Sequence, residues 1–281
     1  MNLRYEILPP SPKFNDCINY YKYIEGFSHG LFKIVPAVTQ ELYFHLNAGN
    51  YIFSSPGLYQ IKHPLIHLIG LHEYQQTVMS NIPRNEMIRG FAVVFKPDGM
   101  QKLFRLSHSE IHRHAIDGEC LFRDHTEELW HEIKTASCIA EMKMRLEAYL
   151  EMYLTDKDFS NAPVTRILES ILKKNGILSL GQLCAEFHIS KRTLQRRFLD
   201  EIGMPPKEYL QIARLNYALK LLKSNQYKHL TELSYLSGYY DQSHYIRDIR
   251  KMFGVSPGSL KRNEDNLMNC DNRIFWDVPM Q

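Results

Sequence analysis

The amino-acid sequence predicts an α+β protein in two parts. The N-terminal part is expected to be a β-rich barrel or sandwich with flanking helices, and the C-terminal part to be all-α with two helix–turn–helix units. Residues 1–105 contain short runs rich in Val, Ile, Tyr and Phe, separated by turn-forming residues. From about residue 99 apolar residues recur at helical spacing. Between residues 179 and 261 one helical unit occurs twice, which indicates a duplicated supersecondary element.

The β-rich part is predicted to be an antiparallel sheet, because several short strands with turn signals between them occur in sandwiches and small barrels. Asn, Gly, Ser and Pro separate the runs, as at Ser55-Pro56-Gly57. We place this domain at residues 1–125, with strands over 31–38, 41–46, 51–54, 63–71 and 88–96.

Residues 126–154 predict two helices, one beginning at Thr126 and one over 139–154. The apolar stripe of the second includes Met142, Tyr149 and Tyr153, which favours a dimerisation surface. Packing of this stripe against the β-rich domain is the alternative. Residues 155–162 contain Asp, Ser and Asn and are predicted to be the interdomain linker.

Residues 163–263 are predicted to be entirely helical. Ser179 and Ser190 are typical helix-capping residues, and Pro206 is typical of a first helical turn. The predicted helices lie at 163–174, 179–187, 190–202, 206–224, 230–237 and 241–253. Residues 264–281 form a tail.

The duplication is visible in the segments 190–206 and 241–257, which share a cap, an apolar stripe, a glycine and a proline. Small residues, Cys184 and Ser234, stand where the two helices of each unit are expected to cross. The turn between them needs a residue that tolerates positive φ, and Gly238 and His188 meet this need. The paired positions are Ser190 with Asp241, Leu194 with Tyr245, Phe198 with Ile249, Ile202 with Phe253, Gly203 with Gly254, and Pro206 with Pro257.

Charge is distributed unevenly along the chain. Residues 1–159 carry 16 Lys/Arg against 19 Asp/Glu, a net charge of −3. Residues 160–263 carry 17 against 8, a net of +9, and residues 264–281 carry 1 against 4, a net of −3. A basic block confined to one domain is typical of proteins that bind a polyanion, although a solvated basic face is the alternative.

The five cysteines are scattered and show no Cys-x-x-Cys spacing, which argues against a disulfide framework and a zinc ribbon. No apolar run approaches the length that spans a bilayer, and the first residues lack the apolar core of a secretion signal. We therefore expect a cytoplasmic protein with no membrane partner.

The second helix of each unit has the side chains that read DNA. Arg can donate two hydrogen bonds to a guanine edge and Gln can pair with an adenine edge, whereas Arg and Lys also bind phosphates. The candidate DNA-binding residues on the outward faces are Lys191, Arg192, Gln195, Arg196, Arg197, Gln242, Ser243, Ile246, Arg247, Arg250 and Lys251.

The segments GYYDQSHYIRDIRK (238–251) and GVSPGSLK (254–261) resemble the second helix–turn–helix unit of the AraC/XylS family of transcription regulators. The matching positions are Gly238, Asp241, Ser243, Arg247, Gly254, Ser256 and Pro257. The resemblance covers about residues 161–263. It implies that recognition helices 190–202 and 241–253 enter successive major grooves of double-stranded DNA. It also implies RNA polymerase and a second copy of the chain as partners.

The segment FAVVFKPDGMQKLF (91–104) is similar to the cupin-like sensing domains that precede such DNA-binding units. This weaker resemblance covers about residues 20–125. It implies a small β-barrel that holds a small-molecule effector, with residues 126–154 as dimerisation helices. It names no cofactor and no catalytic residue, so we do not expect an enzyme.

His112 and His114, followed by Glu119, resemble half of the metal-binding motif of cupin enzymes. No histidine of a second half-motif stands at a matching distance, so surface histidines are the favoured interpretation and no metal site is expected. The same holds for His108 and His112, which are four residues apart. The alternative function is a metal-dependent cupin-type enzyme tethered to a DNA-binding module.

Overall fold

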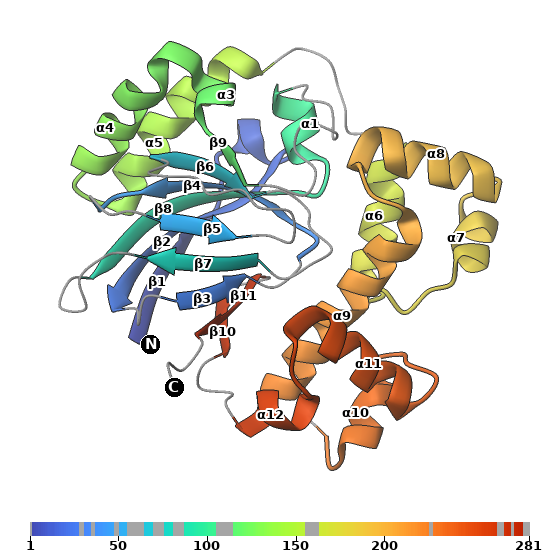
Figure 1. The fold of residues 1–281 in the computed structure, drawn as a ribbon. Helices are drawn as coiled ribbons and strands as arrows, with labels where there is room; N and C mark the ends of the chain where they lie inside the picture. Colours follow the sequence, from blue (N-terminus) through green and yellow to red (C-terminus); the bar gives the residue numbers. More distant parts are fainter. Residues whose placement is uncertain are drawn as a thin grey trace.

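In the computed structural model the N-terminal sheets and their helices form one part of the molecule, and a group of helices forms the other (Figure 1). The structure describes residues 2–27, 31–34, 37–47, 51–54, 65–69, 76–80, 87–104, 115–154, 163–224, 227–262, 267–270 and 273–277. The predicted linker, 155–162, lies outside these residues.

The strands of the N-terminal part form two sheets in which every pair is antiparallel. The first sheet has the order β1-β2-β8-β4-β6-β9, and the second has the order β10-β11-β3-β7-β5. The strands are β1 (Asn2–Leu8), β2 (Ile18–Phe27), β3 (Leu31–Ile34), β4 (Gln40–His45), β5 (Tyr51–Ser54), β6 (Ile66–Ile69), β7 (Gln76–Ser80), β8 (Ile88–Phe95), β9 (Ala115–Asp117), β10 (Leu267–Cys270) and β11 (Arg273–Asp277).

The α+β class, with a β-rich N-terminal part and a helical C-terminal part, is confirmed. The expectation of a barrel is wrong, because among the described residues neither sheet closes on itself: β1 and β9 end one, and β10 and β5 end the other. Closing a barrel requires hydrogen bonds between the outermost strands. The five predicted strands correspond to β3, β4, β5, β6 and β8.

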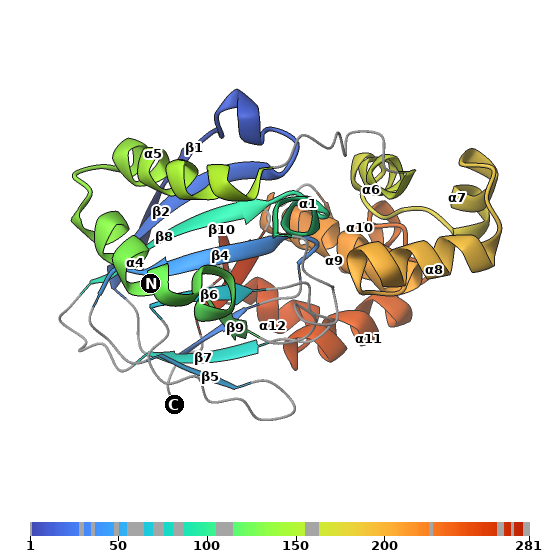
Figure 2. The same cartoon turned by 90° about the horizontal axis from the view of Figure 1, so that it is seen from above.

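Two helices, α4 (Thr126–Thr135) and α5 (Ile139–Leu150), cover one face of the six-stranded sheet, as Figure 2 shows from above. Alternate residues of the strands face these helices, since side chains alternate along a strand. The resulting apolar core includes Leu42, Phe44, Phe91, Val93 and Phe95 from the sheet and Leu129, Ile133 and Leu146 from the helices.

The stripe proposed for dimerisation is engaged within the chain. Met142 is buried, and Tyr149 and Tyr153 pack against the same core. The Tyr153 hydroxyl also donates a hydrogen bond to the Leu121 carbonyl at 3.0 Å. These residues therefore pack against the β-rich domain, which was the alternative interpretation of the stripe. A dimer stays a hypothesis, and this stripe does not support it.

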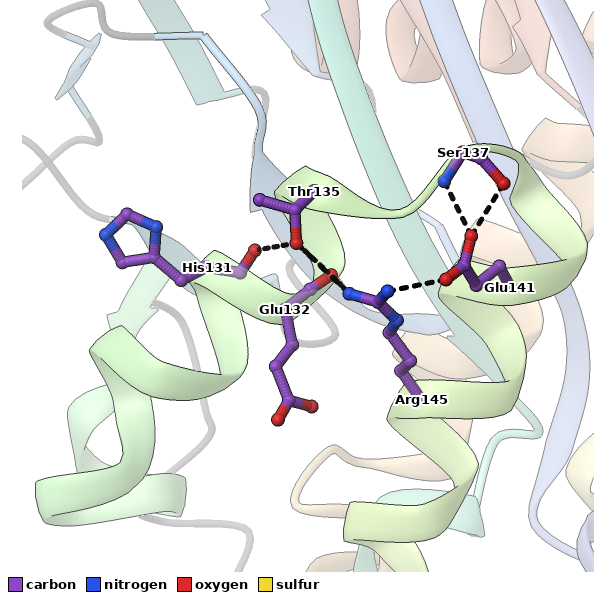
Figure 3. A network of polar contacts seen from close by, with 6 residues as sticks. All are labelled: His131, Glu132, Thr135, Ser137, Glu141 and Arg145. Carbon is purple, nitrogen blue, oxygen red and sulfur yellow. Dashed lines mark hydrogen bonds and ion pairs between the residues drawn. The ribbon is translucent and has the colours of Figure 1, made fainter.

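A polar network joins the end of α4 to the start of α5 (Figure 3). Glu141 accepts hydrogen bonds from the backbone N–H of Ser137 at 2.7 Å and from its hydroxyl at 2.6 Å. Arg145 binds the same carboxylate and donates to the Glu132 carbonyl at 2.6 Å. These bonds lower the pKa of Glu141 from 4.5 to about 2, with Ser137 the larger cause and Arg145 the smaller.

The first six helices of the C-terminal part begin and end close to the predicted residues. They are α6 (Pro163–Lys173), α7 (Leu180–Glu186), α8 (Lys191–Ile202), α9 (Pro206–Ser224), α10 (Leu230–Leu236) and α11 (Gln242–Phe253). α12 (Pro257–Arg262) is a further helix that the sequence analysis did not predict. α9 runs between the pair α7–α8 and the pair α10–α11 (Figure 1). Its side chains are buried on several sides, including Tyr209, Leu215 and Leu222, so it forms the core of both units.

The tail returns to the N-terminal part. β10 and β11 form an antiparallel pair, and β11 pairs with β3 from Phe275 opposite Ile34 to Asp277 opposite Phe32. In the part of the chain that the structure describes, no helix is both long and apolar enough to cross a membrane.

Replacing Glu141 with Gln is expected to lower the free energy of unfolding at pH 7, because the charged partner of Ser137 and Arg145 is lost. The folded-state pKa of Glu141 is depressed, so its contribution is complete above about pH 4.5 and disappears as pH falls through about 2. The difference between E141Q and the wild type should shrink over that range. Urea unfolding at a series of pH values checks this, with E127Q as an exposed control on α4. A difference independent of pH would contradict it.

Candidate DNA-binding surface

The first helix–turn–helix unit begins with a capping box. The Ser179 hydroxyl accepts from the Gln182 backbone N–H at 3.1 Å, and the Gln182 side chain accepts from the Ser179 backbone N–H at 2.8 Å. Ser190 caps α8 by accepting from the Thr193 N–H at 3.1 Å. Between the two helices His188 has φ of 51°, as the sequence predicts.

The second unit repeats this arrangement with different residues. Asp241 caps α11 by accepting from the His244 N–H at 2.7 Å, and Gly238 takes the turn position with φ of 74°. Ser234, the small residue at the helix crossing, is fully buried and its hydroxyl donates to the Thr231 carbonyl at 2.7 Å. α8 and α11 both end at a glycine in the left-handed conformation, Gly203 and Gly254.

The inward faces of α8 and α11 fix which side chains point outward. Leu194, Phe198, Tyr245 and Ile249 are buried in the C-terminal core. Their burial holds each helix in one rotation about its axis, because any other rotation would expose them to water.

The candidate DNA-binding residues lie mainly on the outward faces. The exposed ones are Lys191, Arg192, Gln195, Arg196, Ser243, Arg247, Arg250 and Lys251. Three are partly buried: Arg197, Gln242 and Ile246. The Gln242 side chain accepts a hydrogen bond from the Thr231 hydroxyl at 2.7 Å, and Ile246 packs against the core. These two are therefore engaged within the protein.

The comparisons with known sequences each cover less than a third of this chain. The model of a helix-turn-helix domain family matches residues 183–263. The transcriptional activator RhaS of Klebsiella pneumoniae is 29% identical over 87 residues, which is 31% of this chain and 31% of that protein. RhaS of Salmonella newport is 31% identical over 83 residues, 30% of each chain. The match therefore spans about a third of the length of these relatives.

The fold of most of the chain, across both parts, is similar to that of apo ToxT from Vibrio cholerae, crystallised as a variant. The TM-score is 0.51 at 11% sequence identity, over 86% of this chain and 97% of ToxT. This likeness concerns the fold alone.

The C-terminal part is an AraC/XylS-type DNA-binding domain. The positions that carried the resemblance in the sequence have structural roles within this domain: Asp241 is a cap, Gly238 and Gly254 have positive φ, and Pro257 begins α12. Leu260 on α12 is fully buried in the core of the same domain.

The AraC/XylS-type domain packs directly against the N-terminal domain. Val38, from the segment before β4, is buried in the core of the C-terminal domain, and the Tyr209 hydroxyl lies 3.5 Å from its carbonyl oxygen. Asp98 forms an ion pair with Lys102 at 3.0 Å and accepts a hydrogen bond from Thr165 on α6. The two domains therefore share both an apolar and a polar contact.

A cavity of about 360 Å³ lies beside this contact and is lined from both domains. Lys96 and Asp98 come from the N-terminal domain, and Asn216, Tyr217 and Lys220 come from α9. A molecule in this cavity would touch both domains at once.

The face of the six-stranded sheet opposite α4 and α5 is polar. Lys22 and Glu41 form a fully buried ion pair at 2.7 Å. The His45 and His67 rings stack, with Nε2 of one 2.7 Å from Nδ1 of the other. Burial, and to a smaller extent His67, holds the pKa of His45 well below its ordinary value, so this imidazole is neutral at pH 7.

On this face a small residue of β8 makes room for a larger side chain of β4. The ring of Tyr43 lies where a Cβ on Gly90 would be, so Gly90 is needed for the tyrosine to lie across β8. Ala92 follows on the same face of β8.

The metal-binding hypothesis concerns residues of which little is described. His108, His112 and His114 lie outside the described residues, as does the side chain of Glu119. The described residues contain no group of three or more His, Cys, Asp or Glu side chains placed to hold a metal ion.

Sequence reasoning missed the interdomain residues Val38 and Asp98, as well as the buried pairs of the N-terminal domain. No local pattern marks them, because their partners lie far away in the sequence. It also missed Tyr240, which precedes the cap of α11. A signal for it exists in the sequence, because Cys184 and Ser234 are 50 residues apart whereas the caps Ser190 and Asp241 are 51 apart.

Two glycines in the AraC/XylS-type domain form a matched pair for a stability test. Both have φ above 70°, but a Cβ on Gly238 would lie 2.7 Å from Ile177, whereas nothing lies within 4 Å of one on Gly254. We expect G254A to lower the free energy of unfolding by about 1 kcal/mol through backbone strain alone. G238A should lower it by about 2–4 kcal/mol, because a β-branched side chain must also move. Urea unfolding of the full chain checks this, and equal losses would contradict it.

Proposed function

We propose that the chain is a sequence-specific DNA-binding transcription regulator of the AraC/XylS type, in which α8 and α11 enter successive major grooves. The observation that carries the proposal is the equivalence of the two units: each presents a capped, basic helix, and both units pack on α9.

The length of α9 suits this mode of binding. It has 19 residues and is therefore about 28 Å long. Successive major grooves on one side of B-form DNA are about 34 Å apart. A buried helix of that length can hold two reading helices in register with the duplex.

The outward side chains divide into two groups. Arg192, Gln195 and Arg196 on α8, with Gln242 and Arg247 on α11, have donors suited to base edges. Phosphates are the expected partners of Lys191, Arg197, Arg250 and Lys251. Ser243 and Ile246 complete the candidate surface in the first half of α11. The +9 charge of residues 160–263 supports both kinds of contact.

An effector bound to the N-terminal domain is proposed to control DNA binding. The polar face formed by Lys22, Glu41, Tyr43, His45 and His67 supports a charged or strongly polar ligand. The contact through Val38 and Asp98 supplies the route, because a change in the N-terminal domain alters the surface against which α6 and α9 pack. RNA polymerase and a second copy of the chain are further proposed partners.

Replacing Arg196 or Arg247 with Ala should weaken binding to the preferred duplex by about 1–3 kcal/mol each. Neither change should affect binding to a random duplex as strongly, because base contacts are sequence-dependent. Replacing Arg250 or Lys251 should weaken binding to all sequences alike and reduce the dependence on salt. Titrations at several salt concentrations, with a duplex obtained by selection from random DNA, measure both effects.

Footprinting on the selected duplex tests the geometry. Two protected patches about one helical turn apart are expected. A single patch, or unchanged affinity for both R196A and R247A, would contradict the proposed mode of binding.

Effector control is tested by replacing the buried ion pair with an apolar pair, Lys22→Met with Glu41→Leu. Such a replacement is often neutral or stabilising, so the double variant should fold and bind DNA. We expect charged small molecules that raise the melting temperature of the wild type to lose this effect on the double variant. Thermal unfolding with a panel of amino acids, sugar acids and amines measures it. An equal response of both proteins would contradict this site for the effector.

A further inference from the structure

The two helix–turn–helix units differ by one residue in the turn. Equivalent backbone hydrogen bonds align them: Ile189 N–H donates to the Cys184 carbonyl at 3.1 Å, and Tyr239 N–H donates to the Ser234 carbonyl at 3.0 Å. In the first unit the next residue, Ser190, is already the cap of α8. In the second unit Tyr240 stands between Tyr239 and the cap of α11. Tyr240 is therefore an additional residue inserted just before the second reading helix.

The turn that carries Tyr240 is held on both sides. Tyr239 is buried, and its ring contacts His244 and Tyr245 edge-on and lies 4.8 Å from the Arg214 guanidinium. On the other side Asp241 is fixed by its capping bond. The backbone on either side of Tyr240 is thus anchored in the domain core, and the direction of its side chain is set by anchored neighbours.

Tyr240 itself is 90% exposed, more than any other large apolar residue in the described part of the chain. Single exposed apolar residues are common on protein surfaces, so exposure alone says little. Its place is informative, because the residues at the start of a recognition helix lie closest to the DNA.

The two reading helices differ in the charge of their first turns, which also indicates a DNA contact at Tyr240. α8 begins with two basic residues, Lys191 and Arg192, of which Lys191 can bind a phosphate at the edge of the groove. α11 begins with Gln242, Ser243 and His244, and its first Lys or Arg is Arg247. The second helix therefore has no lysine or arginine in its first turn to make the phosphate contact that Lys191 provides in the first unit.

We propose that Tyr240 is a DNA-backbone contact that supplies this anchor. Its ring packs against a deoxyribose at the edge of the groove entered by α11, and its hydroxyl donates a hydrogen bond to a phosphate oxygen. Tyrosine is among the side chains that make such contacts. This inference rests on the proposed function.

Because tyrosine is neutral, this contact releases no counterion of its own. Loss of Tyr240 should weaken binding to every DNA sequence, as loss of Arg250 should. Loss of Arg250 should also reduce the dependence of affinity on salt, whereas loss of Tyr240 should leave it unchanged. That combination separates Tyr240 from both the base-reading and the ionic residues.

The experiment measures the affinity of the full chain for the selected duplex and for a random duplex at several salt concentrations, with wild type, Y240A, Y240F and Y5A. Y240A should bind both duplexes about 5- to 10-fold more weakly, with the same dependence of affinity on salt as the wild type. Y240F keeps the ring and loses only the hydroxyl, so its affinity should lie between those of Y240A and the wild type. Tyr5 is 52% exposed on β1, far from the reading helices, and Y5A should bind as the wild type does. Equal melting temperatures show that the variants are folded.

Unchanged affinity of Y240A, with a wild type that protects two patches, overturns the contact while leaving the proposed function intact. If the wild type shows no preferred duplex, the proposed function itself fails. If Y240A binds DNA normally but loses promoter activation in a purified transcription reaction, Tyr240 faces the polymerase, and the DNA-backbone contact is overturned.

Discussion

The burial of α9 is the constraint on which the arrangement of the C-terminal domain depends. Eleven of its 19 residues are buried, and they lie on several sides of the helix. A helix that is apolar around most of its circumference must be enclosed by other elements. Here the two helix–turn–helix units enclose α9, so each unit is held in place by packing against the same helix. The Phe198 ring packs edge-on against Tyr209 at 5.8 Å on one side.

The turns on either side show how closely the units approach α9. At Gly176, after α6, a Cβ would lie 2.6 Å from the backbone of both Leu210 and Arg214, so only glycine allows this approach. Tyr209 also lies next to Val38 of the N-terminal domain. The same helix therefore meets both reading units and the N-terminal domain. A change in how the N-terminal domain packs would act directly on the element that sets the spacing of α8 and α11.

The N-terminal domain shows where pattern-based reasoning is weakest. The sequence contains no clear signal for β2, although it is the longest strand among those described. Both faces of β2 are covered, so Tyr20, Tyr21 and Lys22 are all buried in succession and the alternation of a half-exposed strand is absent. A buried lysine further obscures the pattern, because its partner Glu41 lies on another strand. The helix 139–154 misled for a related reason: an apolar stripe looks the same whether it covers its own sheet or another subunit.

The sequence by itself determined the helical domain almost residue by residue. Caps such as Ser179, Ser190 and Asp241, the left-handed Gly203 and Gly254, and the apolar spacing of α8 and α11 all act within a few residues of one another, so local chemistry specifies them. Only the tertiary structure decided that the sheets stay open, that Lys22 pairs with Glu41, and that Val38 enters the core of the other domain. Those contacts join residues that are distant in the chain, and their free energy depends on burial, which no local pattern records.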